Sequence, residues 1–287
     1  MLGMGLTIDP DSFSAVLKVP HHILLGACAQ YTLMPLLACA VSYLLRLPPA
    51  LAAGVILVGV CPGGAASNVI CLLARANVAF SVVLTLTSTI LSVVLIPSLM
   101  QVLAGTLVPV APLALLKSTA QVVLLPLLLG CVLQRLFPRL VAATSNLLPL
   151  VSALGVTAIC SAVIAANATA LYSIGFKLVL AITIMHLLGG VAGYIIGAVF
   201  GLDVSSTRTL SIEVMMQNSS LAVSLANVHF ANPATAVPGA VSATMHSVLG
   251  SILAAIWRFS SSKQPPSMVQ EAPITVESLY RELDEEE

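Results

Sequence analysis

Long apolar stretches with almost no charge limit what this sequence can fold into. Up to residue 258 the chain carries only four acidic and nine basic residues, and charged residues make up 8% of the whole chain. An ordinary soluble domain has roughly 25%. Since a helix needs about 20 apolar residues to cross a bilayer, these runs have room for many passes. The sequence therefore predicts an all-α polytopic membrane protein and excludes a well-solvated surface or a nucleic-acid binder.

Proline, glycine and charged residues divide the apolar runs into expected membrane spans. The eight spans are residues 20–45, 49–75, 77–104, 111–136, 147–167, 173–200, 206–230 and 233–258. Residues 1–19 are expected to hold the end of a partial helix and an amphipathic linker. Most basic loop residues share one side when the spans alternate, which places the acidic tail, residues 259–287, in the cytoplasm.

The order of the spans repeats within the chain. A long helix, an interrupted segment and a Ser/Thr-bearing helix occur at 20–45, 49–75 and 77–104, and again at 173–200, 206–230 and 233–258. An odd number of spans in each repeat inverts the second copy relative to the first. Inverted repeats with interrupted helices are typical of secondary transporters, so we expect that architecture here.

Glu213 is the one acidic residue between Asp203 and Glu271, and it lies inside an apolar span. An ionised carboxylate at membrane depth costs at least about 2.5–3.5 kcal/mol, and something must offset that cost. Arg208 is the one basic residue in the same span, near its end. We expect a proton or a bound cation, rather than this distant base, to balance Glu213.

A second anomaly is the sequence Pro62-Gly63-Gly64 within the span 49–75. Proline removes a backbone donor and glycine weakens helical order, so the helix should break near the middle of the span. Ser67 and Asn68 would begin the half-helix after the break, where side-chain oxygens and the positive end of the helix dipole can meet ligands. A proline kink used only for packing is the alternative interpretation.

Several polar side chains in the apolar core carry the oxygen atoms that hard monovalent cations prefer. These candidates are Gln30, Ser67, Asn68, Ser81, Thr85, Glu213 and Gln217. Ser81 and Thr85 are four residues apart and therefore share one helical face. Such a face also holds helices together in membranes, so packing is the alternative to ligation.

Five groups of residues, in the same order along the chain, resemble the bile acid:sodium symporter family. They are Gly3-Met4-Gly5-Leu6-Thr7, Ala29-Gln30-Tyr31 with Met34-Pro35, Cys61-Pro62-Gly63-Gly64 with Ala66-Ser67-Asn68, Asn77-Val78-Ala79 with Ser81, and Glu213-Val214 with Met216-Gln217-Asn218-Ser219. The resemblance implies ten helices in two inverted five-helix repeats, with the fourth and ninth helices broken and crossing. It assigns residues 20–104 and 171–258 to a core domain and residues 105–170 to panel-type helices.

The resemblance also implies site residues. One sodium site would use Ser67, Asn68, Ser81, Thr85 and Glu213, and a second would use Gln30, Glu213 and oxygens around Val214, Met216 and Gln217. Asn218, Ala65 and Ala66 would face the substrate, although some relatives carry Thr where this chain has Ala65. His246 lies inside the last span and is a further substrate candidate, with a hydrogen-bonded structural role as the alternative.

The function implied is sodium-coupled symport of an organic anion by alternating access, with no cofactor and no catalytic residue. The anion would be a bile-acid-like steroid or a short carboxylic or keto acid. A proton-coupled organic anion carrier is one alternative. A truncated, transport-inactive protein is another, because the chain is N-terminally shortened relative to the family: its first helix and most of its second are missing.

The sequence disfavours two enzymatic alternatives, because each requires features that it does not show. An intramembrane hydrolase would need Ser67 or Ser247 with His246, and nothing in the sequence orients that base toward a nucleophile. A metal-pumping ATPase would need a nucleotide-binding domain, which the sequence lacks. The expected partners are the lipid bilayer, sodium ions and a small organic anion. The oligomeric state stays open, as does the choice between the plasma membrane and an organellar envelope of plastid type.

Overall fold

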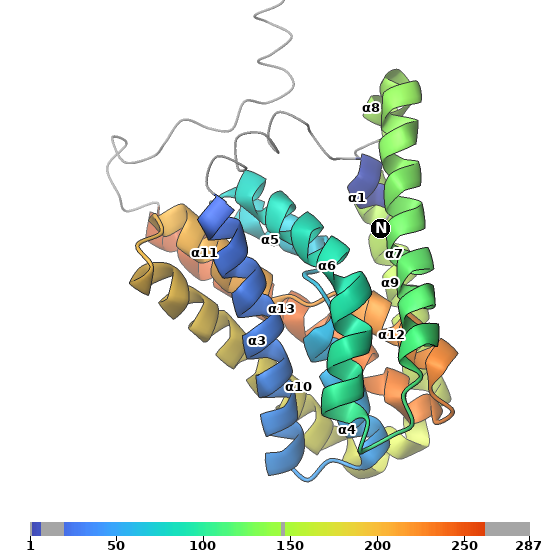
Figure 1. Cartoon of the computed structure of the whole chain (residues 1–287). Coiled ribbons are helices and arrows are strands. Elements are labelled where there is room, and N and C mark those ends of the chain that lie inside the picture. Colours follow the sequence, from blue (N-terminus) through green and yellow to red (C-terminus); the bar gives the residue numbers. More distant parts are fainter. Residues whose placement is uncertain (1, 7–19, 145–146, 262–287) are drawn as a thin grey trace, which may run out of the picture.

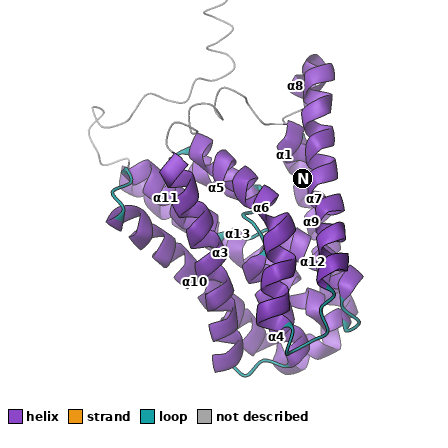
Figure 2. Cartoon of the chain, in the orientation of Figure 1, coloured by secondary structure: helices purple, strands orange, loops and turns teal. Residues whose placement is uncertain are grey.

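The computed structural model describes residues 2–6, 20–144 and 147–261. Every regular element in those ranges is a helix, apart from a single bridge between two residues, as Figure 2 shows. This confirms the all-α prediction. The expected linker and nearly all of the acidic tail lie outside the described residues.

The helices keep the expected order but not always the expected bounds. They are α1 (Leu2–Leu6), α3 (Pro20–Leu44), α4 (Pro49–Val60), α5 (Ala66–Leu73), α6 (Val78–Ala104), α7 (Pro112–Leu136), α8 (Pro138–Thr144), α9 (Leu148–Ala166), α10 (Ala168–Val199), α11 (Val204–Met215), α12 (Ser219–His229), the 3-10 helix η1 (Pro233–Ala236) and α13 (Val237–Ser261). Each of the expected spans 49–75 and 206–230 is occupied by two short helices.

Five helical stretches in the described ranges are long and apolar enough to cross a membrane. They are Pro20–Leu44, Val78–Ala104, Pro112–Leu136, Gly175–Val199 and Pro233–Phe259. The helix expected at 147–167 is present as α9, whose apolar part is shorter, from Leu150 to Ala166. Apolar helices of this number and length fit an integral membrane protein that crosses the bilayer several times.

Figure 1 shows α7 and α8 as a tall column on one side of the molecule, with α3 and α10 on the opposite side. The short helix α1 packs against α7 through glycine. A Cβ atom added to Gly130 would lie only 2.6 Å from the carbonyl oxygen of Leu2, and one added to Gly5 would overlap the carbonyl oxygen of Leu127. The two backbones therefore touch directly, which ties the N-terminal residues to α7.

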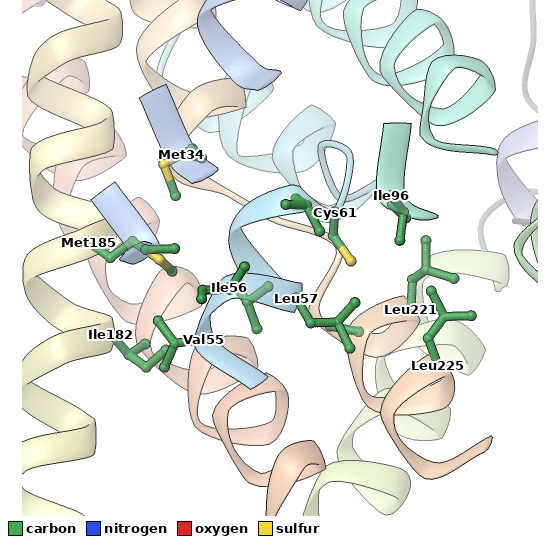
Figure 3. Packing of buried hydrophobic residues seen from close by; sticks show 14 of the residues in the cluster. Met34, Val55, Ile56, Leu57, Cys61, Ile96, Ile182, Met185, Leu221 and Leu225 are labelled. Atoms are coloured by element: carbon green, nitrogen blue, oxygen red, sulfur yellow. The ribbon is translucent and has the colours of Figure 1, made fainter. Parts of the chain in front are cut away.

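Helix α4 lies at the centre of the hydrophobic core. All of its residues from Leu51 to Val60 are buried, as expected for a helix that is apolar on every face. Figure 3 shows its middle residues surrounded by side chains of α3, α6, α10 and α12. The labelled neighbours are Met34, Ile96, Ile182, Met185, Leu221 and Leu225. The break that follows Val60 is therefore placed deep inside the protein.

Asp203, between α10 and α11, caps the N-terminus of α11. Its Oδ1 accepts hydrogen bonds from the backbone N–H groups of Ser205 at 2.9 Å and Ser206 at 3.0 Å. These are two of the N–H groups that a helix start leaves without a partner. Burial acts to raise the pKa of this carboxyl, but the hydrogen bonds from Ser205 and Ser206 outweigh it, so the pKa lies below its ordinary value.

We expect Asp203→Ala to lower the free energy of unfolding by about 1 kcal/mol, the usual cost of losing such a cap. Because the pKa is lowered in the folded protein, the stabilisation is present above the unfolded-state pKa and is lost as pH falls through the folded-state pKa. Asp203→Asn keeps a capping oxygen and should lose only this pH dependence. Thermal unfolding of the detergent-solubilised variants across acidic pH checks both effects; an unchanged melting profile for Asp203→Ala would contradict the capping role.

Candidate functional site

Two stretches of non-helical backbone meet in the core. Residues 61–65 join α4 to α5, and residues 216–218 join α11 to α12. Gly63 and Gln217 form an antiparallel bridge between the two stretches. Two residues 154 positions apart in the sequence are thus held in direct backbone contact at the points where their helices stop.

Hydrogen bonds across this contact satisfy backbone groups that a continuous helix would have paired internally. The N–H of Gly64 donates to the carbonyl oxygen of Met216 at 3.0 Å, and the N–H of Asn218 donates to that of Pro62 at 2.8 Å. A Cβ atom on Gly64 would lie 3.0 Å from the carbonyl oxygen of Gln217, so glycine permits the close approach. Non-helical backbone in an apolar core is tolerated when it is paired in this way.

Glu213 lies in the last turn of α11, beside this contact, and its side chain is only 4% exposed. Its Oε1 accepts hydrogen bonds from the hydroxyls of Ser67 and, at 2.5 Å, Ser81, and its Oε2 accepts one from Thr85 at 2.8 Å. The Ser81 hydroxyl is also 2.7 Å from Oδ1 of Asn68. These five residues, here called the Glu213 cluster, come from α5, α6 and α11 and are the set expected for the first sodium site.

The cluster holds more acceptor oxygens than its hydroxyl hydrogens can serve. Each hydroxyl lies near the carboxylate and near one further acceptor: the Gly64 carbonyl for Ser67 at 2.7 Å, Asn68 Oδ1 for Ser81 at 2.7 Å, and the Ser81 carbonyl for Thr85 at 2.9 Å. A hydroxyl has one hydrogen, so three hydrogens face six oxygen–oxygen contacts. A surplus of oxygens around a carboxylate suits a site that takes up a positive charge.

A small cavity adjoins the carboxylate on the side of α3. It is lined by Gly26, Ala27, Gln30, Leu84, Ser88 and Glu213. A Cβ atom on Gly63 would lie 2.7 Å from Oε2 of Glu213. The missing side chain at Gly63 is therefore what leaves room for the carboxylate in this position.

The residues expected for the second sodium site lie next to this cavity. Nε2 of Gln30 donates to Oε1 of Gln217 at 2.6 Å and to the carbonyl of Cys61 at 3.0 Å. Nε2 of Gln217 in turn donates to the carbonyl of Val214 at 2.7 Å, and the Met216 carbonyl accepts from the other broken segment. All of these groups are buried, so both expected sets of ligands converge on the end of α11.

The substrate candidates are distributed around the same break. Ala65 and Ala66 are exposed at the start of α5. Asn218 is 7% exposed, and its Oδ1 caps α12 by accepting from the backbone N–H of Leu221 at 3.1 Å. His246 is buried in α13, and its Nδ1 is 3.5 Å from the hydroxyl of Ser219. This contact fits a structural role, and the substrate role of His246 stays a prediction.

Arg208 does not form an ion pair with Glu213 within the described residues. Its guanidinium lies over the ring of Trp257, 5.7 Å from the ring centroid, and its Nη1 donates to the carbonyl of Ala74 at 3.5 Å. Trp257 also stacks on Tyr194, with 5.9 Å between the ring centroids. Arg208 therefore does not balance the charge of Glu213 in the described residues, and balance by a proton or a cation stays a prediction.

His186, which is fully buried in α10, was not among the residues predicted from the sequence. Its Nδ1 is 2.7 Å from the carbonyl oxygen of Met215, the last residue of α11, and its Nε2 is 2.8 Å from the hydroxyl of Ser242. The signal that could have found it is the one used for Glu213: a titratable side chain inside an apolar span marks a functional or structural polar site.

Apolar helices of membrane-spanning length around a buried polar centre define the class of this chain, a multi-pass integral membrane protein with a polar site in its core. Residues 1–175 match the model of the Sodium Bile acid symporter family, and the chain belongs to that family. The family consists of transporters, in agreement with the prediction that the chain is not an enzyme.

Individual relatives cover most of the chain. It is 48% identical over 264 residues to the probable sodium/metabolite cotransporter BASS1, chloroplastic, of Arabidopsis thaliana, an alignment that covers 92% of this chain and 66% of the relative. It is 42% identical over 258 residues to the uncharacterized sodium-dependent transporter YocS of Bacillus subtilis (strain 168), covering 90% of this chain and 80% of the relative. The chain thus spans slightly less than two thirds of the length of its plant relative.

Proposed function

We propose that the protein is a sodium-coupled symporter of an organic anion, and that Glu213 is the anionic ligand shared by its sodium sites. The observation that carries the proposal is the surplus of oxygens in the Glu213 cluster. The three hydroxyl hydrogens of the cluster serve six oxygen–oxygen contacts, and a proton on Glu213 would add only one more hydrogen. A sodium ion contacts several oxygens at once, so it suits this arrangement better than a proton does.

The first sodium ion would take oxygens of Ser67, Asn68, Ser81, Thr85 and Glu213. The second would lie on the side of the cavity, where Gln30 and Glu213 line the same space. Carbonyl oxygens of Val214 and Met216 and the side chain of Gln217 would complete it. The single hydrogen bond from Gln30 on α3 to Gln217 in the non-helical segment, at 2.6 Å, supports this pairing of ligands.

Charge explains how the ions and the anion assist each other. With Glu213 ionised, two sodium ions leave a single positive charge at the centre, and a monovalent anion neutralises it. Without sodium the anion would meet a bare carboxylate in a medium of low dielectric constant, where repulsion is several times stronger than in water. Each ligand therefore raises the affinity for the other by the same factor, which is the condition for coupled transport.

Alternating access and the inverted repeat are part of this proposal. The sequence α3, α4 with α5, and α6 corresponds in order to α10, α11 with α12, and α13. These helices would form the core that moves against panel-type helices α7 and α9. Asn218, Ala65 and Ala66 would face the anion near the positive ends of α5 and α12, with His246 close by.

The substrate would be a bile-acid-like steroid or a short carboxylic or keto acid, and the relatives' description as sodium/metabolite cotransporters supports a small metabolite.

Uptake into proteoliposomes tests the proposal. Sodium or choline chloride is placed outside at fixed pH, and a radiolabelled steroid conjugate and a short keto acid are offered in parallel. We expect uptake of one of them to require sodium and to increase with an inside-negative potential, which favours inward movement of one net charge by about 2.3 kcal/mol per 100 mV. Uptake that is equal in choline, or that follows a pH gradient at constant sodium, would reject sodium coupling in favour of a proton-coupled carrier.

A further inference from the structure

A chain of buried hydrogen bonds connects the end of α11 to α10, α13 and α12. It runs from the carbonyl oxygen of Met215 to His186 at 2.7 Å, from His186 to Ser242 at 2.8 Å, and from Ser242 to Ser219 at 2.7 Å. His186 and Ser242 are 0% exposed and Ser219 is 2% exposed. This His186 chain therefore holds both sides of the break between α11 and α12 against two neighbouring helices.

The direction of each hydrogen bond in the chain follows from its first member. A carbonyl oxygen only accepts, so Nδ1 of His186 carries the hydrogen that it donates to Met215. In a neutral imidazole Nε2 is then an acceptor, and Ser242 must donate to it. The single hydroxyl hydrogen of Ser242 is thereby used, so Ser219 donates to Ser242. One tautomer of His186 satisfies every member.

The Met215 carbonyl lies between two carbonyls expected to serve the second sodium site. Helix α11 ends at Met215, so its last carbonyls have no partner within the helix. The Val214 carbonyl accepts from the Gln217 side chain, and the Met216 carbonyl accepts from the N–H of Gly64. His186 engages the one carbonyl between them, and fixing that peptide unit restricts how its two neighbours can turn.

We propose that His186, as the neutral tautomer with hydrogen on Nδ1, is a positioning residue for the second sodium site. It holds the Met215 carbonyl away from the ion, so that the carbonyls of Val214 and Met216 keep the orientation the ion requires. The inference rests on the proposed sodium binding and adds a residue outside both expected sets of ligands. The positioning role belongs to the hydrogen bond from Nδ1 of His186 to the Met215 carbonyl. Ser242 donates to Nε2 and thereby fixes the tautomer.

Substitution of His186 by asparagine or by glutamine tests the hydrogen bonds of its two ring nitrogens separately. In His186→Asn the side-chain amide occupies the place of Nδ1 and can donate to Met215, whereas in His186→Gln it extends to the place of Nε2 and meets Ser242. His186→Leu removes both bonds at similar volume. Ser211→Ala is the matched control, because the Ser211 hydroxyl makes an equally buried bond between α11 and α10, to the Gly190 carbonyl at 2.7 Å, that does not touch the break.

The experiment is equilibrium binding of ²²Na⁺ to the purified full chain in nanodiscs, with monodispersity on size exclusion as the folding readout. We expect half-saturation to rise about tenfold in His186→Leu and His186→Gln, the scale of one lost buried hydrogen bond. His186→Asn and Ser211→Ala should stay within about twofold of wild type. If His186→Leu does not fold, the Asn and Gln pair decides the question on its own.

Three results would overturn the inference. They are wild-type sodium affinity in folded His186→Gln, equal weakening in His186→Asn and His186→Gln, and equal weakening in Ser211→Ala. If Glu213→Gln loses sodium while every His186 variant binds normally, the proposed function stands and the positioning role fails. If wild type itself binds no sodium, the proposed function fails and the positioning role fails with it.

Discussion

Glu213→Gln is expected to abolish sodium binding while leaving the fold intact. Glutamine has the size of glutamate and keeps one acceptor oxygen, which can serve the hydroxyls of Ser67 and Ser81, while Thr85 can still donate to the Ser81 carbonyl. It removes the negative charge, and one charge pair at 4 Å is worth about 4 kcal/mol at an effective dielectric constant of 20. Since 1.4 kcal/mol changes affinity tenfold, we expect a loss of at least about 100-fold.

The measurement is the melting temperature of the purified protein as sodium replaces choline at constant ionic strength and pH. A ligand at 100 times its dissociation constant stabilises the folded state by about 2.7 kcal/mol, so the melting temperature of wild type should rise with sodium. The Glu213→Gln melting temperature should not respond. Glu213→Asp keeps the charge but shortens the side chain, and we expect an intermediate response. A sodium-dependent rise in Glu213→Gln equal to that of wild type would contradict the role of the charge.

Gly63→Ala is expected to have the second-largest effect on sodium affinity. The added Cβ would lie 2.7 Å from Oε2 of Glu213. The carboxylate cannot move aside freely, because Thr85 holds Oε2 while Ser67 and Ser81 hold Oε1. The methyl group should therefore displace the carboxylate at the cost of at least one buried hydrogen bond, weakening sodium binding by more than about tenfold.

The control for Gly63→Ala is Gly155→Ala in α9, where an added Cβ meets nothing within 4 Å. Gly63 is not among the residues with positive φ, so alanine can adopt its backbone conformation and the variant should fold. We expect Gly155→Ala to bind sodium as wild type does and to be slightly more stable, as alanine favours helix over glycine. Wild-type ²²Na⁺ affinity in Gly63→Ala would show that the carboxylate position does not matter.

Local signals in the sequence predicted the helical fold, which the structure confirms, and singled out Glu213 and the segment that follows Val60 as candidate site residues. Glu213 stood out because a carboxylate in an apolar span requires compensation, and Pro62 with its two glycines indicated a break. In the structure, helix α4 ends at Val60, just before this proline, and Gly63 pairs with Gln217, four residues from Glu213. The sequence offered Ser81 and Thr85 as candidate ligands with packing as the alternative, and only the family resemblance assigned them to one sodium site with Glu213.

Features that depend on distant partners were not predictable in the same way. His186 meets Met215 and Ser242, which are 29 and 56 residues away along the chain. His186 itself could be singled out as a titratable side chain in an apolar span, but nothing in the sequence indicates Met215 and Ser242 as its partners. Likewise, each of the spans expected to be interrupted, 49–75 and 206–230, holds two short helices, but no local signal in either span indicates that the two non-helical segments pair with each other. The bridge between Gly63 and Gln217 joins these two segments, and it depends on a partner 154 residues away along the chain.

The most direct test is an experimental structure of the full chain saturated with thallium, a heavy monovalent cation that replaces sodium and is located by its anomalous scattering. We expect one peak among the oxygens of Ser67, Asn68, Ser81, Thr85 and Glu213, and a second between Glu213 and Gln30. Both peaks should weaken when sodium is added in excess. A saturated crystal in which no cation contacts Glu213, and its carboxylate is bonded only to hydroxyls, would contradict the central role assigned to this residue.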